Sequence, residues 1–210
     1  MEAKYRTDID QTVEYYEKNA AAFIESTIDA DVSELYQPFE ELLFPGCRIL
    51  DLGCGSGRDS KYFTDKGYEV VAIDPSPAMC TQTRSLAHIP VYEMKAEEMS
   101  FSNEFDAVWA CASLLHIPYV LQAVAFENIA KALKPGGIFY GSWKYGNREH
   151  VDQARVFSDY DKDMLQDIIQ KTGLFDEIKL WITDDVRRER KSQRWINCLV
   201  QRKNEGLAPL

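Results

Sequence analysis

The sequence predicts an α/β protein with one open, mostly parallel, seven-stranded sheet, helices on both faces and an antiparallel last strand. From residue 48 onward, short apolar runs alternate with helical patterns, as is typical of parallel sheets with crossover helices. Three glycines, Gly53, Gly55 and Gly57, stand where the first apolar run meets a helix. With 45% hydrophobic residues, the 210-residue chain is long enough for one buried core. We therefore expect a single domain.

Two helices are predicted before the first strand. Residues 9–25 lack strand alternation and are rich in Ala, Glu and Tyr, and a second helix over 32–43 is stopped by Pro45 and Gly46. We expect residues 1–44 to form a helical extension that covers the same domain as a lid or cap. Residues 45–203 then form the sheet domain, and 204–210 a flexible tail.

The strands follow in order from residue 48. They are predicted over residues 48–52, 68–73, 90–94, 105–110, 138–143, 175–182 and 195–201. Between them, a helix to residue 66 is capped by Gly67, and Ser76 with Pro77 opens a second helix through 86. A third runs from Pro118 to 133 and a fourth over 160–172, closed by Gly173. The last two strands are joined by a short loop, which favours antiparallel pairing.

Composition disfavours several function classes. The net charge of −10 and the pI near 4.8 oppose binding of nucleic acid, which needs a basic face. Five scattered cysteines without a C-x-x-C pair indicate free thiols in a reducing compartment, and no zinc or other metal site. The chain has no apolar run of the roughly 18 residues needed to cross a bilayer, and its N-terminus is polar. We expect a cytoplasmic protein, monomeric or weakly dimeric, without membrane partners.

The alternate glycines predict a ligand-binding turn. In an open parallel sheet, ligands bind beyond the carboxyl ends of the strands, and residues without side chains allow the backbone to approach a ligand closely. The dinucleotide fingerprint G-x-G-x-x-G would place glycine at position 58, where this chain has Arg58. A NAD-dependent oxidoreductase is therefore the less favoured enzyme class.

Several segments together resemble a known family. The run 48–59, Asp74 at the end of the second strand, Leu114-Leu115-His116 and the Lys-Pro-Gly-Gly run 134–137 are similar to class I S-adenosylmethionine-dependent methyltransferases. Among these, they resemble the small-molecule type related to tellurite-resistance methyltransferases. The resemblance covers about residues 45–145. It implies a Rossmann-like fold, S-adenosylmethionine as cofactor and S-adenosylhomocysteine as product. It also implies direct in-line methyl transfer to a small-molecule acceptor. A non-catalytic protein that binds either compound would keep the same motifs and stays an alternative.

The resemblance also implies which residues contact the cofactor. They are Tyr16, Asp51, Gly53, Cys54, Gly55, Gly57, Asp74, Pro75, Met79, Ala96, Glu97 and Cys111. Asp74 is placed to accept hydrogen bonds from the ribose hydroxyls, and an N-cap ahead of Pro75 is its alternative role. Where the family has an acidic residue for adenine, this chain has Lys95, so Glu97 is the candidate acceptor. Met79 packs either on the adenine or in the core.

Three further side chains have two interpretations each. His116 follows the fourth strand and is the candidate catalytic residue, as a base or by orienting the acceptor; a structural hydrogen bond is the alternative. Tyr15 and Tyr16 either contribute to a lid over the cofactor or pack as one face of an amphipathic helix. Cys111 is expected to pack rather than to act as a nucleophile, because direct transfer needs no covalent intermediate.

A basic loop indicates where the acceptor binds. Residues 183–194 leave the same sheet edge as the glycine turn and are rich in arginine, including Arg188 and the neighbouring Lys191. We expect an anionic acceptor that pairs with an arginine. The predicted acceptor pocket comprises Trp143, Tyr145, Arg155, Arg187 and Trp195. The alternative is a solvated charged hairpin in which Asp184 and Asp185 neutralise their own arginines.

Overall fold

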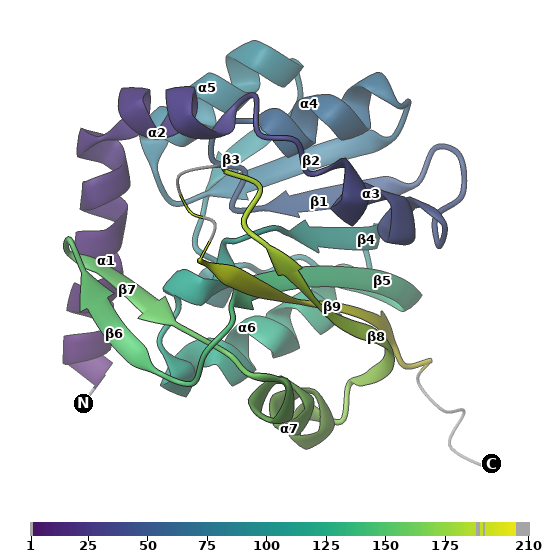
Figure 1. The fold of residues 1–210 in the computed structure, drawn as a ribbon. Coiled ribbons are helices and arrows are strands. Elements are labelled where there is room, and N and C mark those ends of the chain that lie inside the picture. The colour runs from purple at the N-terminus through teal and green to yellow at the C-terminus, as the bar shows by residue number, and fades with distance from the viewer. Residues whose placement is uncertain (1, 188–189, 191, 205–210) are drawn as a thin grey trace.

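The computed structural model describes residues 2–187, 190 and 192–204, and over these residues the main sheet has seven strands (Figure 1). The strand order is β3-β2-β1-β4-β5-β9-β8. β9 is antiparallel to both β5 and β8, and the other pairs are parallel. The predicted fold class is therefore confirmed. The strands are β1 (Arg48–Leu52), β2 (Glu69–Asp74), β3 (Val91–Glu93), β4 (Phe105–Ala110), β5 (Leu133–Lys144), β8 (Phe175–Asp184) and β9 (Arg194–Arg202).

Helices cover both faces of the sheet, as Figure 1 shows with α4 and α5 above it and α6 and α7 below. On one face lie α3 (Ser33–Glu40), α4 (Arg58–Asp65) and α5 (Pro77–Ala87), and on the other α6 (Tyr119–Ala132) and α7 (Lys162–Thr172). Strand alternation separates two cores, because neighbouring residues point to opposite faces. Phe39 and Phe63 pack with Trp109 on the first face, and Phe126 packs with Phe139 on the second.

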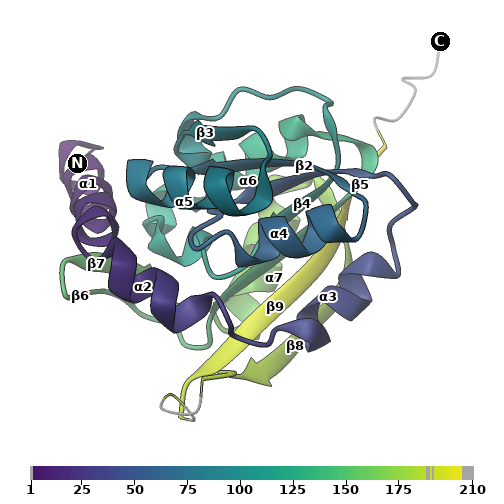
Figure 2. The same cartoon turned by 90° about the horizontal axis from the view of Figure 1, so that it is seen from above.

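The predicted N-terminal helix is two helices, α1 (Glu2–Lys18) and α2 (Ala20–Thr27). They meet at Asn19, whose ψ of 18° departs from the helical value. The Asn19 side-chain amide donates to the Tyr15 carbonyl at 2.8 Å, a local bond of the kind that competes with a continuous helix. Figure 2 shows α1 and α2 along one side of the molecule, with α1 next to the β6–β7 hairpin.

That hairpin is an element the sequence did not reveal. β6 (Glu149–Asp152) and β7 (Arg155–Ser158) form a separate two-stranded antiparallel sheet. Its turn residues, Gln153 and Ala154, both have positive φ, 49° and 65°. Such turns are usually recognised by Asn-Gly or Asp-Gly, so this one has no local signature. The backbone N–H of Val156 donates to Thr12 Oγ1 at 3.0 Å, which ties the hairpin to α1.

Some expectations concern residues beyond the described part of the chain. Arg188 and Lys191 of the basic loop, and positions 205–210 of the expected tail, lie outside the described residues. Within the described part, no helix has the length and apolar character needed to span a membrane. The same part of the chain contains no group of three or more His, Cys, Asp or Glu side chains arranged to hold a metal ion.

Candidate active site

A cavity of about 1090 Å³ opens at the carboxyl edge of the sheet. Its walls come from the glycine turn after β1, the residues after β4, the end of β5, the β7 strand, the β8–β9 connection, and α1 with α2. The parallel strands explain this position, because their carboxyl ends and the loops that follow them meet at one edge. Predicted site residues that line the cavity are Tyr16, Gly53, Cys54, Gly55, Cys111, His116, Arg155, Arg187 and Trp195.

Close contacts leave no room for a side chain at the first glycine of the turn. Gly53 has φ of +80°, and a Cβ built there would lie 2.3 Å from the Cβ of Ser113. Any side chain at this position would therefore displace the segment after β4. The hydroxyl of Ser113 is buried and has no hydrogen-bond partner among the described residues. An unpartnered polar group thus lies directly beside the backbone of Gly53.

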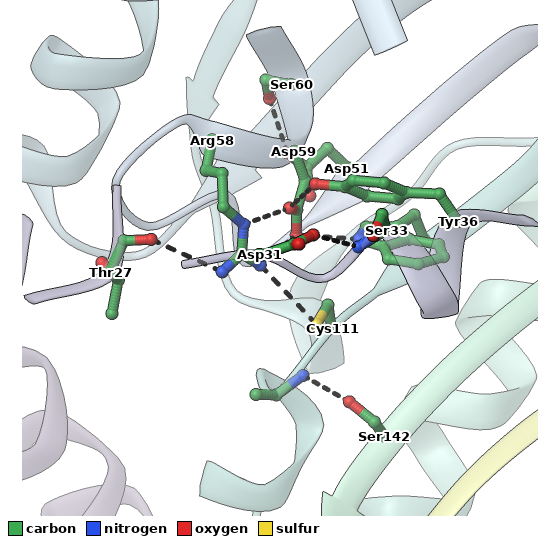
Figure 3. A network of polar contacts seen from close by, with 12 residues as sticks. Thr27, Asp31, Ser33, Tyr36, Asp51, Arg58, Asp59, Ser60, Cys111 and Ser142 are labelled. Carbon is green, nitrogen blue, oxygen red and sulfur yellow. Dashed lines mark hydrogen bonds and ion pairs between the residues drawn. The ribbon is translucent and has the colours of Figure 1, made fainter. Parts of the chain in front are cut away.

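Asp59, at the start of α4, is the centre of a polar network at the site, as Figure 3 shows. Its carboxylate accepts from the Tyr36 hydroxyl at 2.5 Å, from Trp109 Nε1 at 2.9 Å and from Arg58 Nε at 2.6 Å. Burial by itself would raise the pKa of Asp59, but the Arg58 guanidinium and these donors outweigh it and keep the pKa below its ordinary value. The ion pair holds Arg58 against the cavity wall.

Asp51 supports the turn from beneath and does not line the cavity. It is 2% exposed, and the Ser60 hydroxyl donates to its Oδ2 at 2.5 Å. Burial, and secondly the neighbouring charge of Asp59, raise the pKa of Asp51 above its ordinary value. Its carboxyl group is thus suited to holding the base of α4 to β1.

His116 is hydrogen-bonded through both ring nitrogens. Nδ1 lies 2.7 Å from the Val156 carbonyl oxygen, which can only accept, so Nδ1 carries the proton. Nε2 therefore accepts from the Tyr16 hydroxyl, 2.7 Å away. Burial lowers the pKa of His116 to about 4, and the charges of Arg155 and Lys144 act in the same direction. A neutral ring with both nitrogens engaged favours the structural interpretation of His116 over a base.

Asp74 is 8% exposed and lies just outside the cavity lining. It accepts from the backbone N–H groups of Gly55 at 3.0 Å and Ser76 at 2.9 Å, and burial raises its pKa to about 6. The N-cap of α5 is Ser76, so Asp74 does not have the alternative capping role. Glu17 of α1 accepts from the Ser76 hydroxyl at 2.7 Å and from the Ala78 N–H at 3.0 Å. Helix α1 thereby closes over the start of α5.

Five further residues predicted to contact the cofactor, three of them for the adenine, do not line the cavity. These are Gly57, Pro75, Met79, Ala96 and Glu97. Met79 is 1% exposed and fills the core beneath α5, which agrees with its alternative as a core methionine. Lys95 pairs with Asp10 of α1 at 2.6 Å.

Two predicted acceptor residues, Trp143 and Tyr145, do not line the cavity. Trp143 is fully buried on the opposite face of the sheet, where it stacks with Phe126. This corrects the prediction, and the reason is strand alternation: Ser142 and Lys144 of β5 line the cavity instead. Tyr145 lies under the guanidinium of Arg194, whose central carbon is 4.7 Å from the ring centroid.

Arg187 and Trp195 of the predicted acceptor pocket line the cavity, but both are hydrogen-bonded to Asp185. Arg187 donates through Nε and an Nη atom to the two Asp185 oxygens, at 2.9 and 2.7 Å. This neutralisation is what the charged-hairpin alternative described. Trp195 Nε1 also donates to Asp185 at 3.1 Å. The β8–β9 connection is therefore organised around a carboxylate that is 8% exposed.

Cys111 lines the cavity as an unreactive thiol. Burial raises its pKa to about 12, so the nucleophilic thiolate is absent near neutral pH. Its Sγ lies 3.9 Å from an Nη atom of Arg58. This placement agrees with the expectation that Cys111 packs rather than reacts.

Sequence reasoning missed several cavity residues. They are Phe23, Arg58, Ser142, Lys144, Phe157 and Asn197. Alternation along β5 and β9 was an available signal, since Lys144 pairs with Trp195 and Ser142 with Asn197 in the antiparallel register. The positions of Phe23 and Phe157 depend on α2 and the β6–β7 hairpin, which the sequence did not delimit.

Comparison with known proteins agrees with this architecture. Residues 49–137 match the family model described as a methyltransferase domain. An uncharacterised methyltransferase of Synechocystis sp. is 34% identical over 106 residues, which are 49% of this chain and 50% of that protein. The chain thus spans about half the length of this curated relative.

Solved structures share the fold at low identity. The Burkholderia thailandensis 1,6-didemethyltoxoflavin-N1-methyltransferase, solved with 1,6-didemethyltoxoflavin and S-adenosylhomocysteine bound, superposes with a TM-score of 0.77 at 16% identity. The match covers 93% of this chain and 88% of that one. The [4+2]-cyclase SpnF matches at a TM-score of 0.66 and 19% identity, over 81% of this chain and 80% of that one. The fold thus occurs with more than one reaction.

The residues present fit S-adenosylmethionine, the cofactor that the resemblance implies. The backbone of Gly53 and Gly55 faces the cavity, where an amino-acid head group needs close approach, and the unpartnered Ser113 hydroxyl lies beside it. Asp74 stands behind the same turn as a buried acceptor for hydroxyl groups. Residues 49–137 therefore match a methyltransferase domain, and the chain has a fold that solved methyltransferase structures share.

Proposed function

We propose that this protein transfers the methyl group of S-adenosylmethionine to a small-molecule acceptor by direct in-line displacement. The observation that carries the proposal is one continuous cavity, which joins the glycine turn to a wall of cationic and aromatic side chains. Cofactor and acceptor would share this space, so that binding itself aligns the reacting atoms. The motifs over residues 48–59 and 114–116 support the finer proposal of a protein resembling the tellurite-resistance methyltransferases.

The cavity and the buried residues beside it have separate roles in this proposal. Gly53 and Gly55 would bind the amino-acid part of the cofactor through their backbone, and Asp74 would accept from the ribose. Ala96 and Glu97 would meet the adenine. The bound cofactor supplies an already activated methyl group, so the chain's task is to orient the acceptor and exclude water. Tyr16 and the rest of α1 would provide that cover.

The proposal places this activity in the cytoplasm, in a monomer or weak homodimer. Five cysteines that are all free thiols support a reducing compartment. The net charge of −10 supports a small-molecule acceptor over nucleic acid.

Calorimetric titration tests cofactor choice, because it reads binding without needing the acceptor. We expect S-adenosylhomocysteine to bind and NAD not to bind. Binding of NAD with no binding of S-adenosylhomocysteine would contradict the proposal.

A second experiment separates catalysis from binding. Cofactor carrying a labelled methyl group is incubated with the protein and a panel of carboxylates, phenols, thiols and tellurite, and labelled products are counted. Transfer to a panel member supports the methyltransferase. Cofactor binding without transfer to any member favours the non-catalytic alternative. This alternative needs a test because a cyclase has the same fold.

A further inference from the structure

Lys144 presents an unpaired ammonium group to the cavity. It ends β5 on the face that lines the cavity, two residues beyond Ser142. Among the described residues, its Nζ has no hydrogen bond and no ion pair, and its contact is with the face of Phe157, 3.4 Å from the ring centroid. Burial lowers the pKa of Lys144, because removing the ammonium group from water destabilises its charged form. A negatively charged ligand would offset that destabilisation.

Arg155 approaches the same ring from β7. Its guanidinium carbon is 5.1 Å from the Phe157 centroid and 4.3 Å from that of Tyr15. Its Nε is buried and has no hydrogen-bond partner among the described residues. The carboxylate of Asp152 is 3.7 Å away and mostly exposed, and an Nη atom of Arg155 donates to Gln153 Oε1 at 3.3 Å.

Two like charges therefore share one aromatic ring. Burial lowers the pKa of Lys144; the charge of Asp159 raises it and the charge of Arg155 lowers it further, while both cations lower the pKa of His116. No ion pair of 4 Å or less joins Asp159 to Lys144 among the described residues, and the Asp159 carboxylate lies 3.8 Å from His150 Nδ1. Two other cations of the cavity have carboxylates, since Arg58 pairs with Asp59 and Arg187 with Asp185, whereas Arg194 lies over the Tyr145 ring.

We propose that Lys144 and Arg155 together bind a negatively charged group of the methyl acceptor, which makes the acceptor a small organic anion with an aromatic or flat apolar body. The site rests on the proposed function, because it completes the acceptor side of the same cavity. An anion between the two cations accepts from Lys144 Nζ and from the unpartnered Arg155 Nε. The rings of Tyr15, Tyr16 and Phe157 offer apolar surface beside it. Lys144 is then a residue that determines acceptor charge.

Benzoate and benzamide test this site, because they share shape and differ in charge. Each is titrated calorimetrically into the protein saturated with S-adenosylhomocysteine. We expect benzoate to bind at least about tenfold more tightly than benzamide, the scale of one charge-assisted interaction. Lys144→Gln should remove that preference by weakening benzoate alone, and Lys144→Arg should keep it.

Lys171→Gln is the matched control, since Lys171 lies on α7 outside this cavity and pairs with Asp167. It should leave the benzoate affinity unchanged. Equal binding of benzoate and benzamide, no binding of either, or an unchanged preference in Lys144→Gln would overturn the anion site. If Lys144→Gln fails to fold, the affinities of benzoate and benzamide for the unaltered protein still test the anion site. The titration of S-adenosylhomocysteine by itself tests the proposed function. A failure of the proposed function is therefore distinguished from a failure of the anion site.

Discussion

The hydroxyl of Tyr16 lies 2.7 Å from Nε2 of His116, which joins helix α1 to the segment that follows β4. The same helix is tied to β7 through Thr12 and to α5 through Glu17. These bonds come from two successive turns of α1 and reach the segment after β4, strand β7 and the start of α5. Helix α1 therefore covers the cavity as a fixed wall, and His116 serves as one of its attachment points.

The His116 environment predicts a pH effect on stability. An ordinary histidine of the unfolded chain has a pKa of 6.5, whereas burial lowers the pKa of folded His116 to about 4. Between these values the unfolded chain binds a proton that the folded protein does not, so the free energy of unfolding falls as pH decreases. Urea unfolding should show a loss of about 1 to 2 kcal/mol between pH 7 and 5 that His116→Asn lacks. His88→Asn, at an exposed helix end, should keep the dependence; identical pH curves for His116→Asn and the unaltered protein would refute the assignment.

Gly55→Val is expected to abolish binding of S-adenosylhomocysteine. The Gly55 backbone faces the cavity with φ of +50°, so a branched side chain would occupy ligand space and also press on Phe23, 3.3 Å from the added Cβ. Gly67→Val is the control, because Gly67 has φ of +88° and open space around it. Both variants carry backbone strain, and calorimetry should find lost affinity in Gly55→Val alone. Retained affinity in that variant would place the cofactor elsewhere.

Asp74→Ala should weaken binding of S-adenosylhomocysteine by about 1.5 to 3 kcal/mol, the range for hydrogen bonds to a charged group. Burial raises the pKa of Asp74 to about 6, so its carboxylate gains a proton and loses acceptor capacity below that pH. Affinity in the unaltered protein should therefore decrease from pH 7.5 to 5. Asp74→Asn, which does not titrate, should bind weakly and equally at both values, and a pH dependence as steep as that of the unaltered protein would exclude Asp74 as its source.

Asp59→Asn is expected to destabilise the fold by about 3 to 5 kcal/mol, because it leaves the Arg58 charge without its partner in a buried setting. Tyr36 and Trp109 also lose a charged acceptor. The comparison is Asp65→Asn, which removes an exposed pair with Lys61 in the same helix and should cost less than about 1 kcal/mol. Denaturant unfolding of both variants measures the difference, and equal costs would show that the network contributes no more than a surface ion pair.

Most of the sheet was predictable because its signals are local. Apolar runs bounded by glycine and proline marked the strands, and Gly67 and Gly173 with Ser76 marked helix ends. The β6–β7 hairpin escaped because Gln153 and Ala154 adopt positive φ without a turn signature, under contacts supplied by α1. The break between α1 and α2 at Asn19 was also not predicted, because the apolar pattern does not change at that residue.

For the site, the sequence by itself determined the glycine turn and the edge of the sheet at which it opens, because three glycines after a buried strand require that geometry. It could not place Trp143 or Lys144, because the two alternate along β5 and the register with β9 decides which of them meets the cavity. The pairing of Tyr16 with His116 likewise spans 100 residues of sequence. Only tertiary packing brings such groups within hydrogen-bond distance, and their protonation states follow from that burial.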